Sequence, residues 1–236
     1  MSIRFTKKVR AILNHIETYG FITNKQCAMI YYKGGKQPYI QAQTKMKSLY
    51  DNGIVKRTEY KLNKEYIYTI ENKQVSDHAM CVMNLYAYLY NKFEILYFKP
   101  EASWKCKRRS DAHFIIKEDN GDIFGILCEV DLFHKTSKDK LDSMYKSGEI
   151  HNWYKANYGA EGYYPSILIV NNTGKTTIKS DNYEVVVTDF DFTGLDNLLG
   201  VWFIPPYLTY PKDKRSDLQW KNSQRNTITI SQWLYQ

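Results

Sequence analysis

The order of short periodic segments in the first 70 residues constrains the fold of this chain more than any other feature. Residues 6–19 carry apolar side chains at the spacing of one face of an amphipathic helix, namely Val9, Ile12, Leu13 and Ile16. Gly20 follows in the usual position of a left-handed residue that ends a helix. Residues 21–22 read as a short apolar connector, after which Thr23 can cap a second helix that runs to about Tyr31.

A third helix and a hairpin complete this region. Pro38 suits the first turn of a helix whose predicted core face consists of Ala42, Met46 and Leu49. Residues 52–53, Asn-Gly, close that helix, and two short alternating segments at 54–60 and 65–70 predict a pair of strands. Three helices followed by a hairpin resemble the winged helix-turn-helix order. The resemblance implies a DNA-binding domain over residues 1–73, although winged helices also serve as protein-binding modules.

The charge distribution supports a polyanionic partner for the same region. Residues 1–75 hold 14 Lys and Arg against 5 Asp and Glu, a net charge of +9, whereas the rest of the chain has a net charge of −1. Such asymmetry is typical of a nucleic-acid-binding module attached to a near-neutral body. The alternative is a basic domain whose charge serves only solubility.

We expect the outward face of the third helix and the following hairpin to contact double-stranded DNA. Gln41, near the start of the helix, suits bidentate hydrogen bonding to a base edge such as adenine. Lysine and arginine suit the phosphates. The predicted DNA-binding residues are Tyr39, Gln41, Thr44, Lys45, Lys47, Ser48, Lys56, Arg57 and Lys61.

A different pattern begins after the polar linker at 71–76. The predicted elements are a helix from Asp77 to before Glu94, strands at 94–98, 112–117 and 123–132, a long helix at 137–158, and strands at 166–170 and 184–190. This α-β-β-β-α-β-β order resembles the restriction-endonuclease-like fold. The sequence thus predicts an α/β (α+β) protein with that fold over residues 77–192, and an aromatic extension over 193–236 that packs on it.

Three carboxylates stand where that resemblance places an active site. Asp111 opens one predicted strand, and strand alternation puts Glu129 and Asp131 on one face of the next. Convergent carboxylates suit Mg²⁺, which makes Asp111, Glu129 and Asp131 the candidate metal ligands and catalytic residues. The same acids could instead only pair with Arg108, Arg109 or Lys135.

The sequence departs from the active pattern at Asp131, where the resemblance implies a lysine. That lysine normally stabilises charge on the attacked phosphate. Lys138 or Lys140, on the following helix, could reach back to replace it, and Lys140 is the favoured candidate. Without a bound metal ion, Asp131 adds repulsion among the carboxylates, so we expect a poor catalyst.

A closer resemblance joins the two parts of the chain. A winged helix followed by the segments Ser110-Asp111-Ala112, Glu129-Val130-Asp131 and Lys140-Leu141, with Tyr145, is similar to the replication-relaxation family. Ser110 replaces the proline that this family also shows. The resemblance spans roughly residues 5–190 and implies DNA transactions of plasmids and conjugative or phage-like elements, with replication or relaxase proteins as partners.

The remaining sequence features limit the classes of site and the location that the protein can have. The four cysteines lack the C-x-x-C spacing of zinc or redox motifs, and the five histidines lack metal-site spacing, so the histidines are interpreted as structural. There is no signal-like segment and no apolar run of membrane-spanning length, which predicts a cytoplasmic protein without a membrane partner. Three functions stay open: a DNA-binding protein of a mobile element, acting as a monomer or a homodimer, a Mg²⁺-dependent DNA endonuclease, and a protein-binding adaptor.

Overall fold

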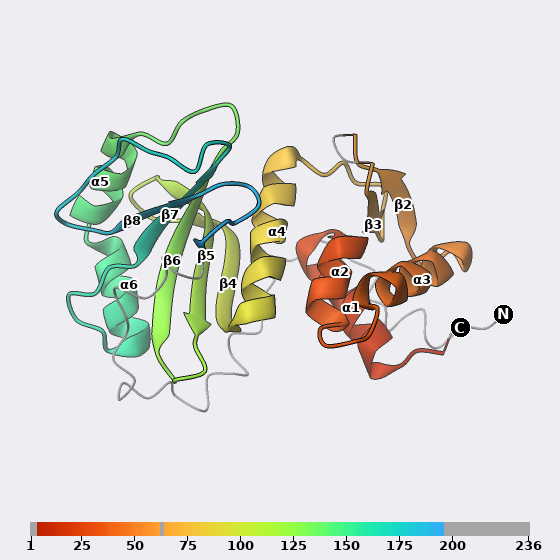
Figure 1. Ribbon diagram of the computed structural model, residues 1–236. Coiled ribbons are helices and arrows are strands. Elements are labelled where there is room, and N and C mark those ends of the chain that lie inside the picture. Colours follow the sequence, from red (N-terminus) through yellow and green to blue (C-terminus); the bar gives the residue numbers. More distant parts are fainter. Residues whose placement is uncertain (1–3, 62–63, 196–236) are drawn as a thin grey trace.

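The computed structural model describes residues 4–61 and 64–195 and shows a mixed α/β protein (Figure 1). The described residues form six helices, a three-stranded antiparallel sheet and a five-stranded mixed sheet. The predicted α/β class is therefore confirmed at this level. The predicted extension at 193–236 lies outside the described residues from 196 onward, and Leu195 is fully buried in the main core.

The first 70 residues form the smaller sheet and its three helices, here called the N-terminal unit. Its elements are α1 (Lys7–Tyr19), β1 (Ile22–Thr23), α2 (Asn24–Tyr31), α3 (Pro38–Asp51), β2 (Lys56–Glu59) and β3 (Tyr66–Thr69). Gly20 ends α1 with a φ of 91°, which favours glycine. Thr23 and Gln26 form a capping box at the start of α2, and Pro38 opens α3.

One part of this region differs from the sequence-based expectation. Residues 21–22 were expected to be a plain connector, but Ile22 and Thr23 form strand β1 and pair with Tyr68 and Ile67 of β3. The small sheet consequently has the order β1-β3-β2. Two residues are too few for an alternating pattern, so periodicity alone does not reveal this strand.

The remaining elements build the sheet unit, residues 77–195. They are α4 (Asp77–Lys92), β4 (Glu94–Ser103), β5 (Arg109–Lys117), β6 (Ile123–Asp131), α5 (Lys138–Lys146), α6 (Glu149–Tyr158), β7 (Ser166–Asn171) and β8 (Val185–Thr188). The strand order is β4-β5-β6-β7-β8. The pairs β4–β5 and β5–β6 are antiparallel, and the pairs β6–β7 and β7–β8 are parallel.

The long helix predicted at 137–158 is wrong in one respect, because the structure divides it into α5 and α6. Gly148 lies between the two helices with a φ of 67°, a left-handed conformation that interrupts a helix. The apolar spacing continues across the break, since Leu141, Met144, Ile150 and Tyr154 are all buried on the same side of the sheet. Periodicity therefore favoured one helix where the backbone makes two.

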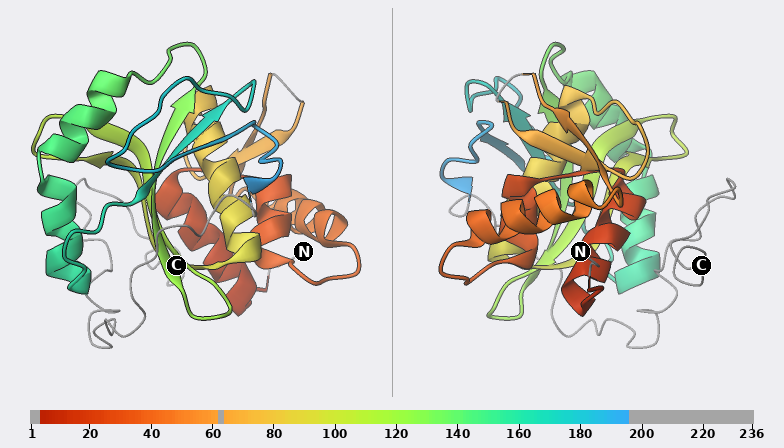
Figure 2. Two further views of the ribbon diagram at one scale, coloured as in Figure 1. Left: turned by 60° about the vertical axis from the view of Figure 1, so that its left-hand side comes forward. Right: turned by 90° about the vertical axis from the view of Figure 1, so that its right-hand side faces the viewer.

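The large sheet separates two layers of helices, as two further views also show (Figure 2). Helices α5 and α6 cover one face, where Leu127 and Ile167 contribute to their core. Helix α4 covers the other face, where Phe114 and Ile126 are fully buried. This division follows from the alternation of side chains along each strand.

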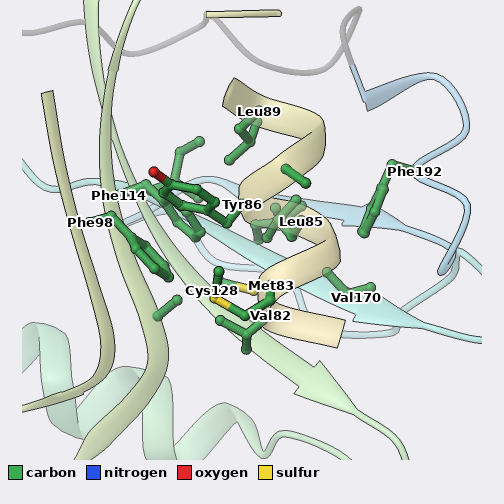
Figure 3. Close-up of a cluster of buried hydrophobic side chains, with 14 of the residues drawn as sticks. Val82, Met83, Leu85, Tyr86, Leu89, Phe98, Phe114, Cys128, Val170 and Phe192 are labelled. Atoms are coloured by element: carbon green, nitrogen blue, oxygen red, sulfur yellow. The ribbon is translucent and has the colours of Figure 1, made fainter. Parts of the chain in front are cut away.

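Helix α4 also joins the two units, because its opposite side packs on the N-terminal helices (Figure 1). Leu85 and Met83 lie within a single buried cluster that includes Ile30 of α2 as well as residues of the large sheet (Figure 3). At this junction the Gln26 side chain donates a hydrogen bond to Asn84, with a 2.8 Å separation between Nε2 and Oδ1. The predicted domains 1–73 and 77–192 thus share a continuous core. None of the helices in the described ranges is both long enough and apolar enough to cross a membrane.

Candidate functional site

The first candidate site is the outward face of α3 in the N-terminal unit. The expected core residues Ala42, Met46 and Leu49 are fully buried, which turns the opposite face of the helix outward. Tyr39 is 46% exposed and Ile40 is 53% exposed. The polar residues predicted to contact DNA are also at the surface, fully or in part: Gln41, Thr44, Lys45, Lys47 and Ser48.

The hairpin that follows carries the other predicted contacts. Lys56 and Lys61 are exposed, but the Arg57 guanidinium lies between two aromatic rings. Its central carbon is 4.2 Å from the ring centroid of Tyr50, at the end of α3, and 4.3 Å from that of Tyr66 in β3. Arg57 therefore stabilises the packing of α3 on the hairpin through cation–π contacts, in addition to any contact with DNA.

The second candidate site lies at the edge of the large sheet where β6 ends. The pairing of β5 with β6 stops at Ala112 and Cys128, whereas β5 continues beside β4 to Arg109 and β6 continues beside β7 to Asp131. The strands fork at this point, and the fork separates the antiparallel half of the sheet from the parallel half. The parallel strands β6 and β7 both end at this edge, and open α/β sheets carry ligand sites at the carboxyl ends of such strands.

Glu129 is the deepest of the three predicted carboxylates, with only 2% of its surface exposed. Lys140 of α5 reaches it, and its Nζ lies 2.5 Å from Glu129 Oε2. The sequence-based expectation that a lysine of the following helix approaches this strand therefore matches the geometry. Burial raises the pKa of Glu129, and Lys140 opposes that shift. The other oxygen, Oε1, is buried without a hydrogen-bond partner among the described residues.

Asp111 contacts a histidine that the sequence analysis regarded as structural. Its Oδ1 lies 2.8 Å from Nε2 of His78, and its Oδ2 accepts a hydrogen bond of 2.7 Å from the backbone N–H of Val130. The Asp111 carboxylate raises the pKa of His78, while burial opposes this. His78 lies in the first turn of α4, far from Asp111 in the chain. No local pattern of residues therefore predicts this contact from the sequence.

Asp131 holds a loop closed. Its Oδ1 accepts hydrogen bonds from both the backbone N–H and the hydroxyl of Thr136, at 2.9 Å and 2.7 Å. These bonds close the loop at 132–136 between β6 and α5. Asn171, which pairs with Asp131 at the end of β7, makes the same two contacts with Thr173. Asp131 thus acts as a turn-forming residue, a common use of aspartate at strand ends.

These contacts bear on the predicted magnesium site. Each of the three carboxylates has a protein partner, and Lys140 stands beside Glu129 where a cation would bind. Across the described ranges, no group of three or more His, Cys, Asp or Glu side chains could hold a metal ion. Binding of Mg²⁺ here would require these carboxylates to exchange their present partners for the ion, and it stays a prediction. Of the alternative cationic partners, Arg109 pairs instead with Glu101 at 3.4 Å.

Comparisons with known proteins add no assignment to these two sites. No family model, curated protein or solved structure matches the chain. The resemblance to the replication-relaxation family stays an expectation from the residues quoted above, and the geometry of the sites carries the functional argument.

Proposed function

We propose that the N-terminal unit binds double-stranded DNA as a winged helix, with α3 in the major groove and the β2–β3 hairpin as the wing. One observation carries the proposal: α3 presents exposed polar and basic side chains opposite a fully buried apolar face, beside a hairpin with exposed lysines. The order of helices and strands and the net charge of the first 75 residues support it.

We further propose that the sheet unit is a nuclease-like domain that no longer cleaves DNA and serves as a platform for assembly. Its support is the contact made by each expected catalytic carboxylate. Glu129 pairs with a lysine, Asp111 contacts a histidine, and Asp131 closes a loop. Such a protein suits replication, mobilisation or transcriptional control of a mobile element, with replication or relaxase proteins as partners.

Equilibrium binding of a labelled duplex tests the DNA-binding proposal. We expect the logarithm of the binding constant to fall linearly with the logarithm of the salt concentration, because lysine–phosphate contacts release counterions. A chain that binds no duplex at low salt, or binds it without salt dependence, contradicts the proposal and favours a protein-binding adaptor.

A Mg²⁺-dependent endonuclease is the second candidate function. The observation in its favour is that Lys140 reaches Glu129 from the following helix, as a relocated catalytic lysine would, and that Oε1 of Glu129 is buried without a hydrogen-bond partner among the described residues. Cleavage requires positive charge around the pentavalent phosphate. The carboxylates here are already bonded to other protein groups, and the one lysine among those groups is paired with a carboxylate, so its charge is not free to stabilise the phosphate.

We therefore expect no multiple-turnover cleavage of supercoiled plasmid DNA with millimolar Mg²⁺ or Mn²⁺. Melting curves recorded with the same ions measure any binding to the carboxylates, since an ion that binds only the folded state raises the melting temperature. Such a rise, if seen, must vanish in Glu129→Ala to be assigned to this site. Nicking by the wild type that is lost in both Asp111→Ala and Lys140→Ala would establish the endonuclease.

A further inference from the structure

The loop that Asp131 closes presents an unusual side chain. Phe133 is 84% exposed, whereas Ile40, the next most exposed large apolar residue among the described residues, is 53% exposed. Exposing a phenyl ring forgoes the favourable free energy of burial. The exposure therefore indicates either a tolerated surface residue or a contact with a partner, and the surroundings of the ring distinguish the two.

Two anchors fix the loop below Phe133. Thr136 donates two hydrogen bonds to Asp131, and Leu132 packs against the main core. Ser137 then caps α5 by accepting a hydrogen bond from the N–H of Lys140. The loop is held at both ends, so its backbone is already ordered around Phe133. Binding through the exposed ring would therefore cost little backbone entropy.

The loop presents an exposed lysine as well as the exposed ring. Lys135 is exposed two residues after Phe133, whereas Lys138, at the start of α5, forms an ion pair with Asp142. A protein interface of ordinary size buries about 800 Å² on each partner. A single exposed ring followed by an exposed lysine matches instead the pairing of an aromatic platform with a phosphate-binding group that single-stranded nucleic acids require.

The loop lies at the same end of the molecule as the proposed wing (Figures 1 and 2). Two contacts connect these regions through the first turn of α4. The Tyr60 hydroxyl, at the end of the hairpin, lies 2.6 Å from Asp77 Oδ1, and the next residue, His78, contacts Asp111 at the fork where β6 ends. DNA that is bound along the hairpin and extends over this end of the molecule would pass near the loop.

We propose that Phe133 stacks on an unpaired base of DNA whose duplex portion is held by the N-terminal unit. The inference rests on the proposed DNA binding and narrows its substrate to a junction between duplex and single strand. The base must be unpaired because the faces of bases within a duplex are covered by their neighbours. Lys135 supplies the accompanying phosphate contact.

The test compares a forked duplex with a fully paired duplex that has the same paired length. We expect the wild type to prefer the fork, and Phe133→Ala to lose that preference by about tenfold in the dissociation constant. Binding to the paired duplex and the salt dependence should stay unchanged, because no charge is removed. Phe133→Trp should retain the preference, whereas Phe133→Leu, which is apolar but has no ring, should lose it.

The controls separate this inference from the proposed function. Lys135→Ala should weaken fork binding and reduce its salt dependence, which distinguishes a phosphate contact from stacking. Asp131→Ala, which releases the loop, should reduce the preference for the fork while the ring remains.

Wild-type protein that binds both duplexes equally, with Phe133→Ala indistinguishable from it, overturns the inference and leaves duplex binding intact. Sedimentation with anionic vesicles that depends on Phe133, without a fork preference, would also overturn it in favour of a membrane surface.

Discussion

Acidification from pH 6.5 to pH 5 is expected to lower the free energy of unfolding by about 3 kcal/mol through two buried histidines. His15 is 3% exposed and His113 is 1% exposed, and burial lowers the pKa of each to about 3. Below the unfolded-state pKa of 6.5, the unfolded chain binds a proton at each histidine and the native chain does not. The contribution of the two histidines to the free energy of unfolding is therefore fully present well above that pH. It is lost progressively toward pH 3, by up to about 1.4 kcal/mol per pH unit for each histidine.

Urea unfolding at several pH values measures this effect, and single replacements assign it. His113, whose Nε2 lies 2.7 Å from the Tyr154 hydroxyl, is replaced in His113→Gln; His15, which packs among tyrosine rings, is replaced in His15→Leu. Each variant should lose about half of the histidine contribution to the slope of stability against pH. Glu129 acts in the opposite sense because its raised pKa lets the native state hold a proton that the unfolded state releases. A slope unchanged by both replacements would contradict the account.

Removal of the Lys140 side chain is expected to cost about 3–5 kcal/mol of stability at pH 8, because it leaves the Glu129 carboxylate buried without its partner. The Lys140 side chain is 26% exposed and that of Glu129 only 2%, so water cannot replace the lost contact at the carboxylate. The loss should be smaller at pH 5, since burial raises the pKa of Glu129 and a protonated carboxyl needs no cation.

The double variant Lys140→Met with Glu129→Gln distinguishes an unpaired charge from a general packing defect. Replacing both members of a buried ion pair is often close to neutral, so the double variant should recover most of the stability lost in Lys140→Ala. Lys138→Ala is the matched control, because Lys138 forms an exposed i,i+4 pair with Asp142 on the same helix. Equal losses in Lys140→Ala and Lys138→Ala would contradict the proposed pairing.

Local signals in the sequence predicted the local parts of this structure. Thr23 caps α2, Pro38 opens α3, and the apolar face of α3 points inward as its spacing indicated. Each of these features depends on residues of one short segment, with successive members no more than four positions apart. The approach of Lys140 to Glu129 was also expected, because the resemblance implies a lysine near this strand and Lys140 lies in the first turn of the following helix.

Contacts between distant segments could not be predicted in the same way. His78 meets Asp111 only because α4 packs beside the fork of the large sheet. Asp131 was interpreted as a metal ligand from its position in a motif, whereas its hydrogen bonds to Thr136 depend on the path of the following loop. The exposure of Phe133 follows from that path too. Sequence patterns place such residues on a strand or a loop but do not show what they face.

The salt dependence of duplex binding in the double variant Lys47→Ala with Lys56→Ala tests the central claim most directly. Both lysines are exposed, one on α3 and one at the start of β2, whereas Arg57 is left in place because its stacking supports the packing of the hairpin. The matched control is Lys117→Ala with Lys155→Ala, which removes the same charge from the sheet unit at two exposed ion pairs. The account predicts a log–log slope about two units shallower and weaker binding in the first variant, with the control close to the wild type. Equal slopes and affinities in the two double variants would contradict DNA binding through α3 and the hairpin.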